Sequence, residues 1–331
     1  SGSSTQVACS LGSYQPNPGT TSCIYATPGH YVDQAAATSE QSCQLGEYQP
    51  STARQSCMTA DIGYYVDSIG SSGQTKCLPG KYNPDEGAMT VDACIDAAPG
   101  FHVPTTTTGA SSQTPCSAGT YQAAYGMTEC TEAEAGYYVD TTEASSPTPC
   151  SAGSYQPSTG QVSCLDAGDG HYVAGTGQSE HTPCPIGTYQ PDVGKIICED
   201  ADPGYFVGED GSTTQTGCHA GTYQPGQAQE SCISTEPGYY VTGTKATEKT
   251  PCSPGKWQNQ TGMTTCNSAE PGFHAPNPGA DNQTPCPSGT FQSEFDSIEC
   301  ESAQPGYVVS LDGMAVSSPC PTGSYQSAGG Q

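Results

Sequence analysis

Apolar and polar positions follow one repeated pattern along the whole chain. Counting cysteines from the N-terminus, a glycine stands three residues after each odd-numbered cysteine and an aromatic residue stands two further on, as at Gly153 and Tyr155. Six residues after each even-numbered cysteine stands another glycine, usually followed by two aromatic or histidine residues and a valine, as in Gly204-Tyr205-Phe206-Val207. No stretch keeps a 3.6-residue apolar period, so the pattern predicts an all-β or irregular fold with almost no helix.

The cysteines set the length of the repeat. Their spacing alternates between 14 and 20 residues, giving a 34-residue unit with one 39-residue copy. Self-similarity at a fixed period is typical of a stacked array in which each unit contacts its neighbours. The complete repeats are 9–42, 43–76, 77–115 (the longer, irregular copy), 116–149, 150–183, 184–217, 218–251, 252–285 and 286–319. Residues 1–8 match the end of a preceding repeat and 320–331 the start of another, so we expect a window on a longer array.

Repeat 150–183 illustrates the local structure that we expect. Gly153 supplies a turn and the next three residues form a short strand. Pro157 and Gly160 then bracket a tight turn, and the segment back to Cys164 is the return strand of a hairpin. The second half opens with a turn and a strand, and a Ser/Thr/Gly loop leads to the next cysteine. The whole therefore predicts an elongated rod of tandem disulfide-stapled β-hairpin repeats.

Composition places this rod outside the cell. Only 33% of the 331 residues are hydrophobic, so a single large core is not expected, while 19 regularly spaced cysteines predict a disulfide scaffold made in an oxidising compartment. We therefore expect an extracellular or cell-surface location for a secreted protein. The chain has neither an initiator methionine nor a signal peptide, which indicates a mature or partial chain.

Charge and motifs exclude several functions. A net charge of −26 makes nucleic acid and anionic membranes poor partners, and no run of 18 apolar residues could span a bilayer. The chain has no G-x-S-x-G, no phosphate-binding loop and no recurrent Ser/His/Asp set. Since each distinctive residue recurs in every copy, whereas an enzyme needs one unique cleft, we expect no catalysis and no cofactor.

Two cysteine pairings fit this spacing. One joins the cysteines across the 20-residue intervals and leaves Cys9 over. The other joins the nearer cysteines and leaves Cys320, which then pairs beyond Gln331 or is a free or intermolecular thiol. The hairpin expected between the nearer cysteines favours this second pairing. Its members are Cys9–Cys23, Cys43–Cys57, Cys77–Cys94, Cys116–Cys130, Cys150–Cys164, Cys184–Cys198, Cys218–Cys232, Cys252–Cys266 and Cys286–Cys300.

The repeat resembles a known kind of extracellular module. The run C-x-x-G-x-Y-Q, a cysteine 14 residues after the first, and then P-G-Y-Y, is similar to the ephrin-receptor-like cysteine-rich repeats. The first half, as in Cys184-Pro185-Ile186-Gly187-Thr188-Tyr189 with Cys198, also resembles the opening module of TNF-receptor cysteine-rich domains. That resemblance implies the hairpin pairing. Arrays of such units are similar to those of large protist and algal surface proteins, including proteins of flagellar hairs (mastigonemes).

Histidines and acidic runs are the candidate metal ligands. His30 and His171 fill the first aromatic position after the repeat glycine, His102 and His274 fill the second, and His181 and His219 flank the next cysteine. With no C-x-x-C or H-E-x-x-H motif, packing explains these histidines better than zinc binding, and we predict no metal site. The acidic runs Glu199–Asp202 and Glu209–Gly211 could hold Ca²⁺, but they match no EF-hand loop and a solvated surface is the better interpretation.

Tyrosine and glycan sites complete the candidates. The 20 tyrosines could form a binding face for carbohydrate or peptide, or a packing spine, which we favour because aliphatic residues are scarce. Asn259 and Asn282 begin N-glycosylation sequons, and the tracts 105–114 and 141–148 are rich in Ser, Thr and Pro and suit O-glycans. Glycans are therefore expected partners.

These expectations favour a non-enzymatic structural protein of a cell-surface filament, built by self-association of identical chains. The alternative is an adhesion or receptor ectodomain that binds a protein or carbohydrate ligand at the irregular repeat 77–115.

Overall fold

The fold is a series of two-stranded antiparallel hairpins, as the sequence predicts. A computed structural model describes residues 6–330; residues 1–5 and 331, which include parts of both expected partial repeats, lie outside the described part. Over the described range there are 36 strands of two residues each, β1 to β36, and one short 3-10 helix, η1 (Val91–Ala93). The prediction of a nearly all-β array with almost no helix is confirmed.

In half of the hairpins, a disulfide joins a cysteine just before the first strand to a cysteine just before the second strand. They are β1–β2 (Ser13–Tyr14, Ile24–Tyr25), β5–β6 (Glu47–Tyr48, Met58–Thr59), β9–β10 (Lys81–Tyr82, Ile95–Asp96), β13–β14 (Thr120–Tyr121, Thr131–Glu132), β17–β18 (Ser154–Tyr155, Leu165–Asp166), β21–β22 (Thr188–Tyr189, Glu199–Asp200), β25–β26 (Thr222–Tyr223, Ile233–Ser234), β29–β30 (Lys256–Trp257, Asn267–Ser268) and β33–β34 (Thr290–Phe291, Glu301–Ser302). The cysteines pair as Cys9–Cys23 through Cys286–Cys300, the nearer partners throughout.

The other half have no disulfide of their own. They are β3–β4 (His30–Tyr31, Gln41–Ser42), β7–β8 (Tyr64–Tyr65, Thr75–Lys76), β11–β12 (Phe101–His102, Thr114–Pro115), β15–β16 (Tyr137–Tyr138, Thr148–Pro149), β19–β20 (His171–Tyr172, Thr182–Pro183), β23–β24 (Tyr205–Phe206, Thr216–Gly217), β27–β28 (Tyr239–Tyr240, Thr250–Pro251), β31–β32 (Phe273–His274, Thr284–Pro285) and β35–β36 (Tyr307–Val308, Ser318–Pro319).

Both kinds of hairpin share one register, which the sequence analysis did not anticipate. In β1–β2, Ser13 lies opposite Tyr25, and in β3–β4, His30 lies opposite Ser42, with the same 12-residue offset. The first strands begin at Ser13 and His30, 17 residues apart. Each 34-residue repeat is therefore two 17-residue structural units, of which only the first carries a disulfide.

Two local predictions need correction. The return strand of a disulfide hairpin, such as β18, follows Cys164 instead of preceding it. The second half of each repeat is a full hairpin, since β24 pairs with β23 where we expected only a loop. The reason is that strand pairing is confined to the base of each hairpin, and the long segment between the strands makes backbone hydrogen bonds to an earlier part of the chain, as from the N–H of Gly211 to the carbonyl of Cys184.

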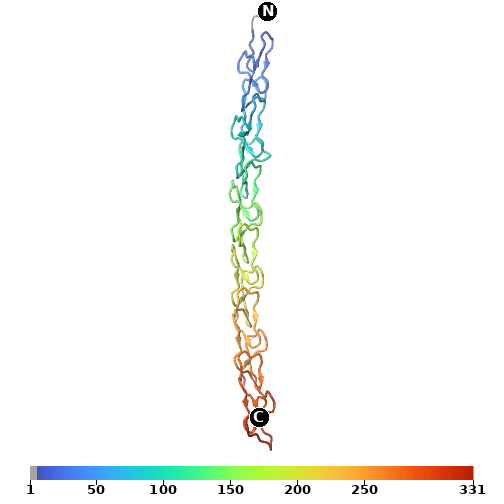
Figure 1. Ribbon diagram of the computed structural model, residues 1–331, viewed down its shortest axis with the longest axis vertical. Helices are drawn as coiled ribbons and strands as arrows, with labels where there is room; N and C mark the ends of the chain where they lie inside the picture. Colours follow the sequence, from blue (N-terminus) through green and yellow to red (C-terminus); the bar gives the residue numbers. More distant parts are fainter. Residues whose placement is uncertain (1–5, 331) are drawn as a thin grey trace, which may run out of the picture. The chain divides into compact units, whose positions relative to one another are not determined.

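Clustering of contacts divides the chain into two compact units. Of the described residues, unit 1 holds those from residue 6 to Ser151 with Tyr155–Leu165 and Thr176–Glu180, and unit 2 holds Ala152–Ser154, Asp166–Gly175 and those from His181 to residue 330. Within each unit the hairpins follow one another in sequence order, blue to green in unit 1 and yellow-green to red in unit 2 (Figure 1).

Cysteine, alanine, valine and glutamine form the interior. Ala26 and Cys43 are fully buried at equivalent positions of two successive 17-residue units, and Val32 and Gln49 are buried at another such pair. We predicted that tyrosines form the main core. This is wrong, because most tyrosines in the strands are only half-buried. The backbones of neighbouring units approach so closely that only small side chains, or an amide that bonds the backbone, fit between them.

Candidate functional site: a recurring backbone contact

Within each compact unit, the 17-residue structural units contact one another mainly through one residue each, which bonds to an earlier 17-residue structural unit. We call these the anchor residues: Ala36, Ala53, Gly70, Gly87, Gly109, Gly126, Glu143, Gly160, Gly177, Gly194, Gly211, Ala228, Lys245, Gly262, Gly279, Asp296, Gly313 and Gly330. Each has a positive φ, and its N–H donates to the carbonyl of a buried residue earlier in the chain. An example is Gly262, whose N–H lies 2.8 Å from the carbonyl oxygen of Thr235.

The carbonyl group of an anchor residue lies directly against a glycine earlier in the chain. We call these earlier glycines the contact glycines. In one such pair, the contact glycine Gly221 lies against the carbonyl of the anchor residue Gly262. The Gly221 N–H donates to Val241 at 2.9 Å, and its carbonyl accepts from Thr235 at 3.1 Å. A Cβ at Gly221 would lie closer than 3.0 Å to the carbonyl oxygen of Gly262, nearer than real Cβ atoms come to such an atom. The backbones therefore touch, and the same contact accounts for the glycine before the first strand of each hairpin from β1–β2 to β31–β32.

The anchor position tolerates side chains that the contact position does not. Six anchor residues are not glycine, although all have φ between 54° and 61°: Ala36, Ala53, Glu143, Ala228, Lys245 and Asp296. The left-handed conformation is unfavourable for these residues, so the backbone bonds around them must offset the strain. From the sequence, Gly160 was predicted only as a turn residue. Its contact with an earlier part of the chain was not predicted, nor was the equivalent position in the second half of the repeat, Gly177, because the residue type at this position varies. A signal was present in the 17-residue spacing of Gly160, Gly177, Gly194 and Gly211.

A buried glutamine closes each regular disulfide hairpin in the interior of both units. Gln190, 2% exposed, donates from Nε2 to the carbonyl of Ile197 at 3.0 Å. Its Oε1 accepts from the N–H of Asp192 at 3.1 Å. The side-chain amide of Gln190 thus satisfies one backbone group on each side of the loop, as a backbone hydrogen-bond partner would. In the irregular repeat Asn83 takes this role, donating to Asp85 and to Tyr64 at 2.9 Å each.

The irregular repeat keeps the recurring contact despite its insertions. η1 lies within the longer Cys77–Cys94 loop. Nevertheless the N–H of Gly80 donates to Val103 at 3.0 Å, and the N–H of Gly109 donates to Cys77 at 3.2 Å. The extra residues are thus accommodated in loops, and the backbone contacts of unit 1 continue through this copy.

Lys245 shows how a long anchor side chain is accommodated. Its Nζ lies 5.0 Å from the centre of the Tyr205 ring, a cation–π contact. A Cβ on Gly217 would lie 2.7 Å from Cγ of Lys245. Six sister copies have proline where Gly217 stands, and four of these prolines pack against a glycine anchor, as Pro183 does against Gly211. Gly217 therefore makes room for the stem of Lys245.

We expect Gly217→Pro to destabilise this hairpin by about 1 kcal/mol, because proline displaces Lys245 from Tyr205 and crowds its stem. With Lys245→Gly, the same proline reproduces the sister copies and should cost nothing. Native-state hydrogen exchange on the four proteins of this double-mutant cycle measures the coupling. Equal costs of the proline in both backgrounds would contradict the explanation.

Four of the six histidines occupy aromatic positions of the strands, His181 and His219 flank a cysteine, and several of the six make specific polar contacts. His30 Nδ1 lies 3.1 Å from Oγ1 of Thr27, and His219 Nδ1 lies 2.9 Å from the carbonyl of Ala220. His102 and His274 each lie against a disulfide sulfur. In each of these two places the histidine and the two cysteines offer three atoms within 4.8 Å of one another. Because both cysteines are oxidised, they present no thiolate to a metal ion.

His171 and His181 form a stacked pair on β19–β20. Their ring centroids lie 4.0 Å apart with an interplanar angle of 13°. His181 Nδ1 accepts a long hydrogen bond, 3.4 Å, from the N–H of Gly168. Gln215 takes this role in a sister copy, where its Oε1 accepts from Asp202 N–H at 2.7 Å. Burial, and secondarily the neighbouring His171, lower the pKa of His181.

This lowered pKa predicts a loss of local stability in acid. The folded state binds the proton less readily than the unfolded chain does, so the stabilisation is complete above the ordinary histidine pKa of 6.5 and is lost as pH falls through the lowered value. We expect amide exchange around β19–β20 to speed up between pH 7.5 and pH 5, relative to the intrinsic rates. His181→Gln keeps a hydrogen-bond acceptor and removes the titrating group, so amide exchange around β19–β20 should not speed up in acid in this variant. If exchange in the variant speeds up in acid as much as in the native chain, His181 is not the group responsible.

The acidic runs serve turns and remain solvated. Glu199 and Asp200 form β22 and are exposed. Asp210 Oδ1 accepts from the N–H of Ile186 at 3.0 Å, and Asp312 Oδ1 accepts from Ser288 N–H at 2.7 Å in a later copy. These carboxylates cap the turn that follows a repeat cysteine. An open hollow beside Phe206 is lined by this loop, from Gly208 to Thr214.

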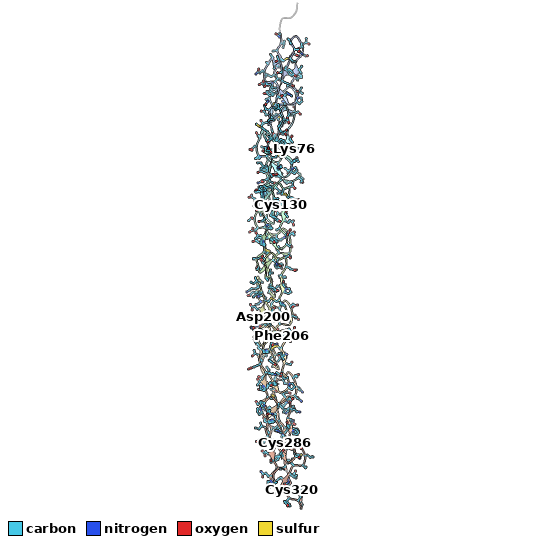
Figure 2. The ribbon with its side chains drawn as sticks, in the orientation of Figure 1. Lys76, Cys130, Asp200, Phe206, Cys286 and Cys320 are labelled. Atoms are coloured by element: carbon cyan, nitrogen blue, oxygen red, sulfur yellow. A yellow bond between two sulfur atoms is a disulfide. The ribbon has the colours of Figure 1, made fainter. Side chains whose placement is uncertain are left out.

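The remaining candidate residues lie at the surface or near it. Asn259 and Asn282 are exposed in the segments between paired strands, as the predicted sequons require. Cys320 is a free, half-buried cysteine among the residues that the structure describes (Figure 2). The Ser/Thr tracts 105–114 and 141–148 lie mostly at exposed positions of the β11–β12 and β15–β16 hairpins.

The part of the chain that the structure describes has no helix of the length and apolar character needed to cross a bilayer. No protein-family model matches the sequence, and no curated protein matches it either. Tandem hairpins with regular disulfides are typical of extracellular proteins, and that is the functional class the architecture supports.

Proposed function

We propose that this chain is a segment of a non-enzymatic extracellular structural protein that belongs to a cell-surface filament. The observation that carries the proposal is the recurring backbone contact between anchor residues and contact glycines. One geometry is repeated along each unit by main-chain hydrogen bonds of 2.7 to 3.2 Å from the anchor residues. Repetition of one contact suits length and mechanical continuity, whereas catalysis needs one enclosed cleft.

The disulfides support a load-bearing role. Each one joins a buried cysteine to a cysteine 14 or 17 residues later, and a loop of about 15 residues is stabilised by roughly 3 kcal/mol through its crosslink. Under tension, only the segment outside such a loop can extend. Self-association of identical chains would continue the filament, and glycans at Asn259 and Asn282 would keep its acidic surface hydrated. The similarity of the repeat to ephrin-receptor-like modules agrees with an extracellular role.

Electron microscopy of the native, unreduced protein tests this proposal. We expect long, uniform filaments that disassemble or soften after a reductant is added. Isolated particles that do not associate at any ionic strength would contradict the filament. Since the net charge of −26 opposes association, the comparison should include low and high salt.

The alternative is an adhesion or receptor ectodomain, and one observation favours it. The irregular repeat exposes aliphatic side chains around its inserted loop: Leu78, Met89, Val91 and Ile95 are 69, 57, 53 and 46% exposed. Clustered apolar side chains at a unique loop are typical of a protein-binding surface.

A ligand-capture experiment separates the two functions. An extracellular extract from the source organism would be passed over the immobilised chain and over the variant Met89→Ser/Val91→Ser. Capture of a protein or glycan by the first and not the second supports the ectodomain. Equal retention on both removes the irregular repeat as a ligand site and leaves the filament proposal untouched.

A further inference from the structure

Two of the nine disulfides have an imidazole nitrogen against one sulfur. His102 Nδ1 lies 3.2 Å from Cys130 Sγ in unit 1. The same arrangement occurs in unit 2, where His274 Nδ1 lies 3.1 Å from Cys300 Sγ. Each histidine is the second residue of the first strand in a hairpin that has no disulfide of its own. Its side chain lies against the disulfide of the next repeat (Figure 2 labels Cys130 and Cys286).

The chemistry of sulfur decides which histidine tautomer can form a hydrogen bond here. A disulfide sulfur has no hydrogen to donate, so the contact is a hydrogen bond in the tautomer whose Nδ1 carries the hydrogen. An N–H that donates to Cys130 Sγ withdraws electron density from that sulfur and stabilises negative charge that develops on it. The other sulfur, on Cys116, is fully buried, while Cys130 and His102 are half-buried. The polarised sulfur is therefore the more accessible one.

We infer that Cys116–Cys130 and Cys286–Cys300 are exchange-prone disulfides, activated by His102 and His274 for reaction with a dithiol. The remaining disulfides act as inert crosslinks by comparison. One of these disulfides lies in unit 1 and the other in unit 2. Their reduction would release one hairpin loop in each unit, while the other disulfides stay closed. This inference does not depend on the proposed function.

The reaction balances with a dithiol as the reductant. A thiolate of the dithiol attacks Cys130 Sγ, the S–S bond breaks, and its electron pair leaves on Cys116 Sγ, which takes a proton. The second thiolate of the dithiol then attacks its own sulfur in the mixed disulfide. The electron pair leaves on Cys130 Sγ, where the Nδ1–H of His102 stabilises the charge. The dithiol becomes a cyclic disulfide, and its two electrons and two protons end on the two cysteines.

The chain supplies its own control residues. The sister copies place Tyr31, Tyr65, Tyr138, Tyr172, Phe206, Tyr240 and Val308 at the position of His102 and His274. A tyrosine there fits the fold and has no ring N–H. His102→Tyr and His274→Tyr are therefore native-like variants that remove the donor. Tyr172→His is the reciprocal variant, which brings an imidazole to Cys184–Cys198.

Timed partial reduction tests the inference. The native chain is exposed to dilute dithiothreitol without denaturant, quenched with N-ethylmaleimide at intervals, and digested. Mass spectrometry then gives the labelled fraction of every cysteine, while circular dichroism checks that each variant is folded. We expect His102→Tyr to slow reduction of Cys116–Cys130 roughly three- to tenfold and leave the other disulfides unchanged, with the same result for His274→Tyr at Cys286–Cys300.

The reciprocal variant decides any case in which a substitution alters local packing. Faster reduction of Cys184–Cys198 in Tyr172→His, with the other disulfides unchanged, supports the inference. Unchanged rates at all three disulfides in the three variants overturn it. The inference is also overturned if His102→Tyr speeds reduction and Tyr172→His has no effect, because opening of the hairpin would then control the rate.

Discussion

Replacing Gly221 by alanine should destabilise its part of unit 2 by about 2–5 kcal/mol. The left-handed conformation, at φ +87°, costs a non-glycine residue about 1–2 kcal/mol, and the added methyl overlaps the carbonyl of Gly262, where overpacking costs about 1–3 kcal/mol. Both the N–H and the carbonyl of Gly221 are hydrogen-bonded, so the backbone cannot move aside without breaking a bond. Native-state hydrogen exchange of the amides of Gly221 and Gly262 measures the loss.

Gly262→Ala is the matched control. Gly262 also has a positive φ, +70°, but a Cβ there would meet nothing closer than Oγ of Ser234 at 4.0 Å. Alanine already fills the anchor position at Ala36, Ala53 and Ala228. We expect a cost of about 1 kcal/mol, from strain alone. If both substitutions cost the same, contact between the two backbones is not what selects glycine at Gly221.

Replacing the buried Gln190 by leucine should cost about 2–3 kcal/mol. Leucine has a similar volume, so packing changes little, but the carbonyl of Ile197 and the N–H of Asp192 lose their partner. The loop enclosed by Cys184–Cys198 should loosen although its disulfide remains. Denaturant unfolding of the disulfide-intact chain, combined with exchange of the Asp192 amide, measures the effect.

Gln178→Leu provides the comparison. The Gln178 side chain is exposed, and its Nε2 donates only to the nearby carbonyl of Thr176 at 3.3 Å. Surface substitutions of this kind usually change stability by less than about 0.5 kcal/mol. A similar loss in both variants would show that the buried amide does not hold the loop.

These predictions depend on features that the sequence indicated to different degrees. The turn before Ser154, the strand that starts there and the strand at Tyr205 were all predictable, because glycine and aromatic residues recur beside cysteines at fixed offsets. The return strand at Thr216 was not, because a threonine and a glycine in a Ser/Thr-rich stretch have no strand pattern and pair only through the register of the hairpin.

The candidate site was predictable only in part. Each contact glycine is evident in the sequence as a repeated residue, but not the reason for it, which is a carbonyl 41 residues further along the chain, as for Gly221 and Gly262. Gln190 stands in the repeated run after the aromatic residue, yet polar residues are usually exposed, and only the structure shows it to be buried. His102 looked like a substitute for tyrosine until its distance to a sulfur was known.

The sequence by itself determined the array: the repeat length, the pairing of the nearer cysteines, the scarcity of helix and the acidic surface. It could do so because those properties are local and recur, so that each copy checks the others. Tertiary structure alone decided that each repeat is two equivalent 17-residue units, which residues serve as anchors, and which side chains reach a sulfur or a loop. Those properties depend on contacts between residues 20 to 41 positions apart in the chain, where backbone geometry matters more than residue type. For this reason residues as different as Lys245 and Gly262 both serve as anchor residues.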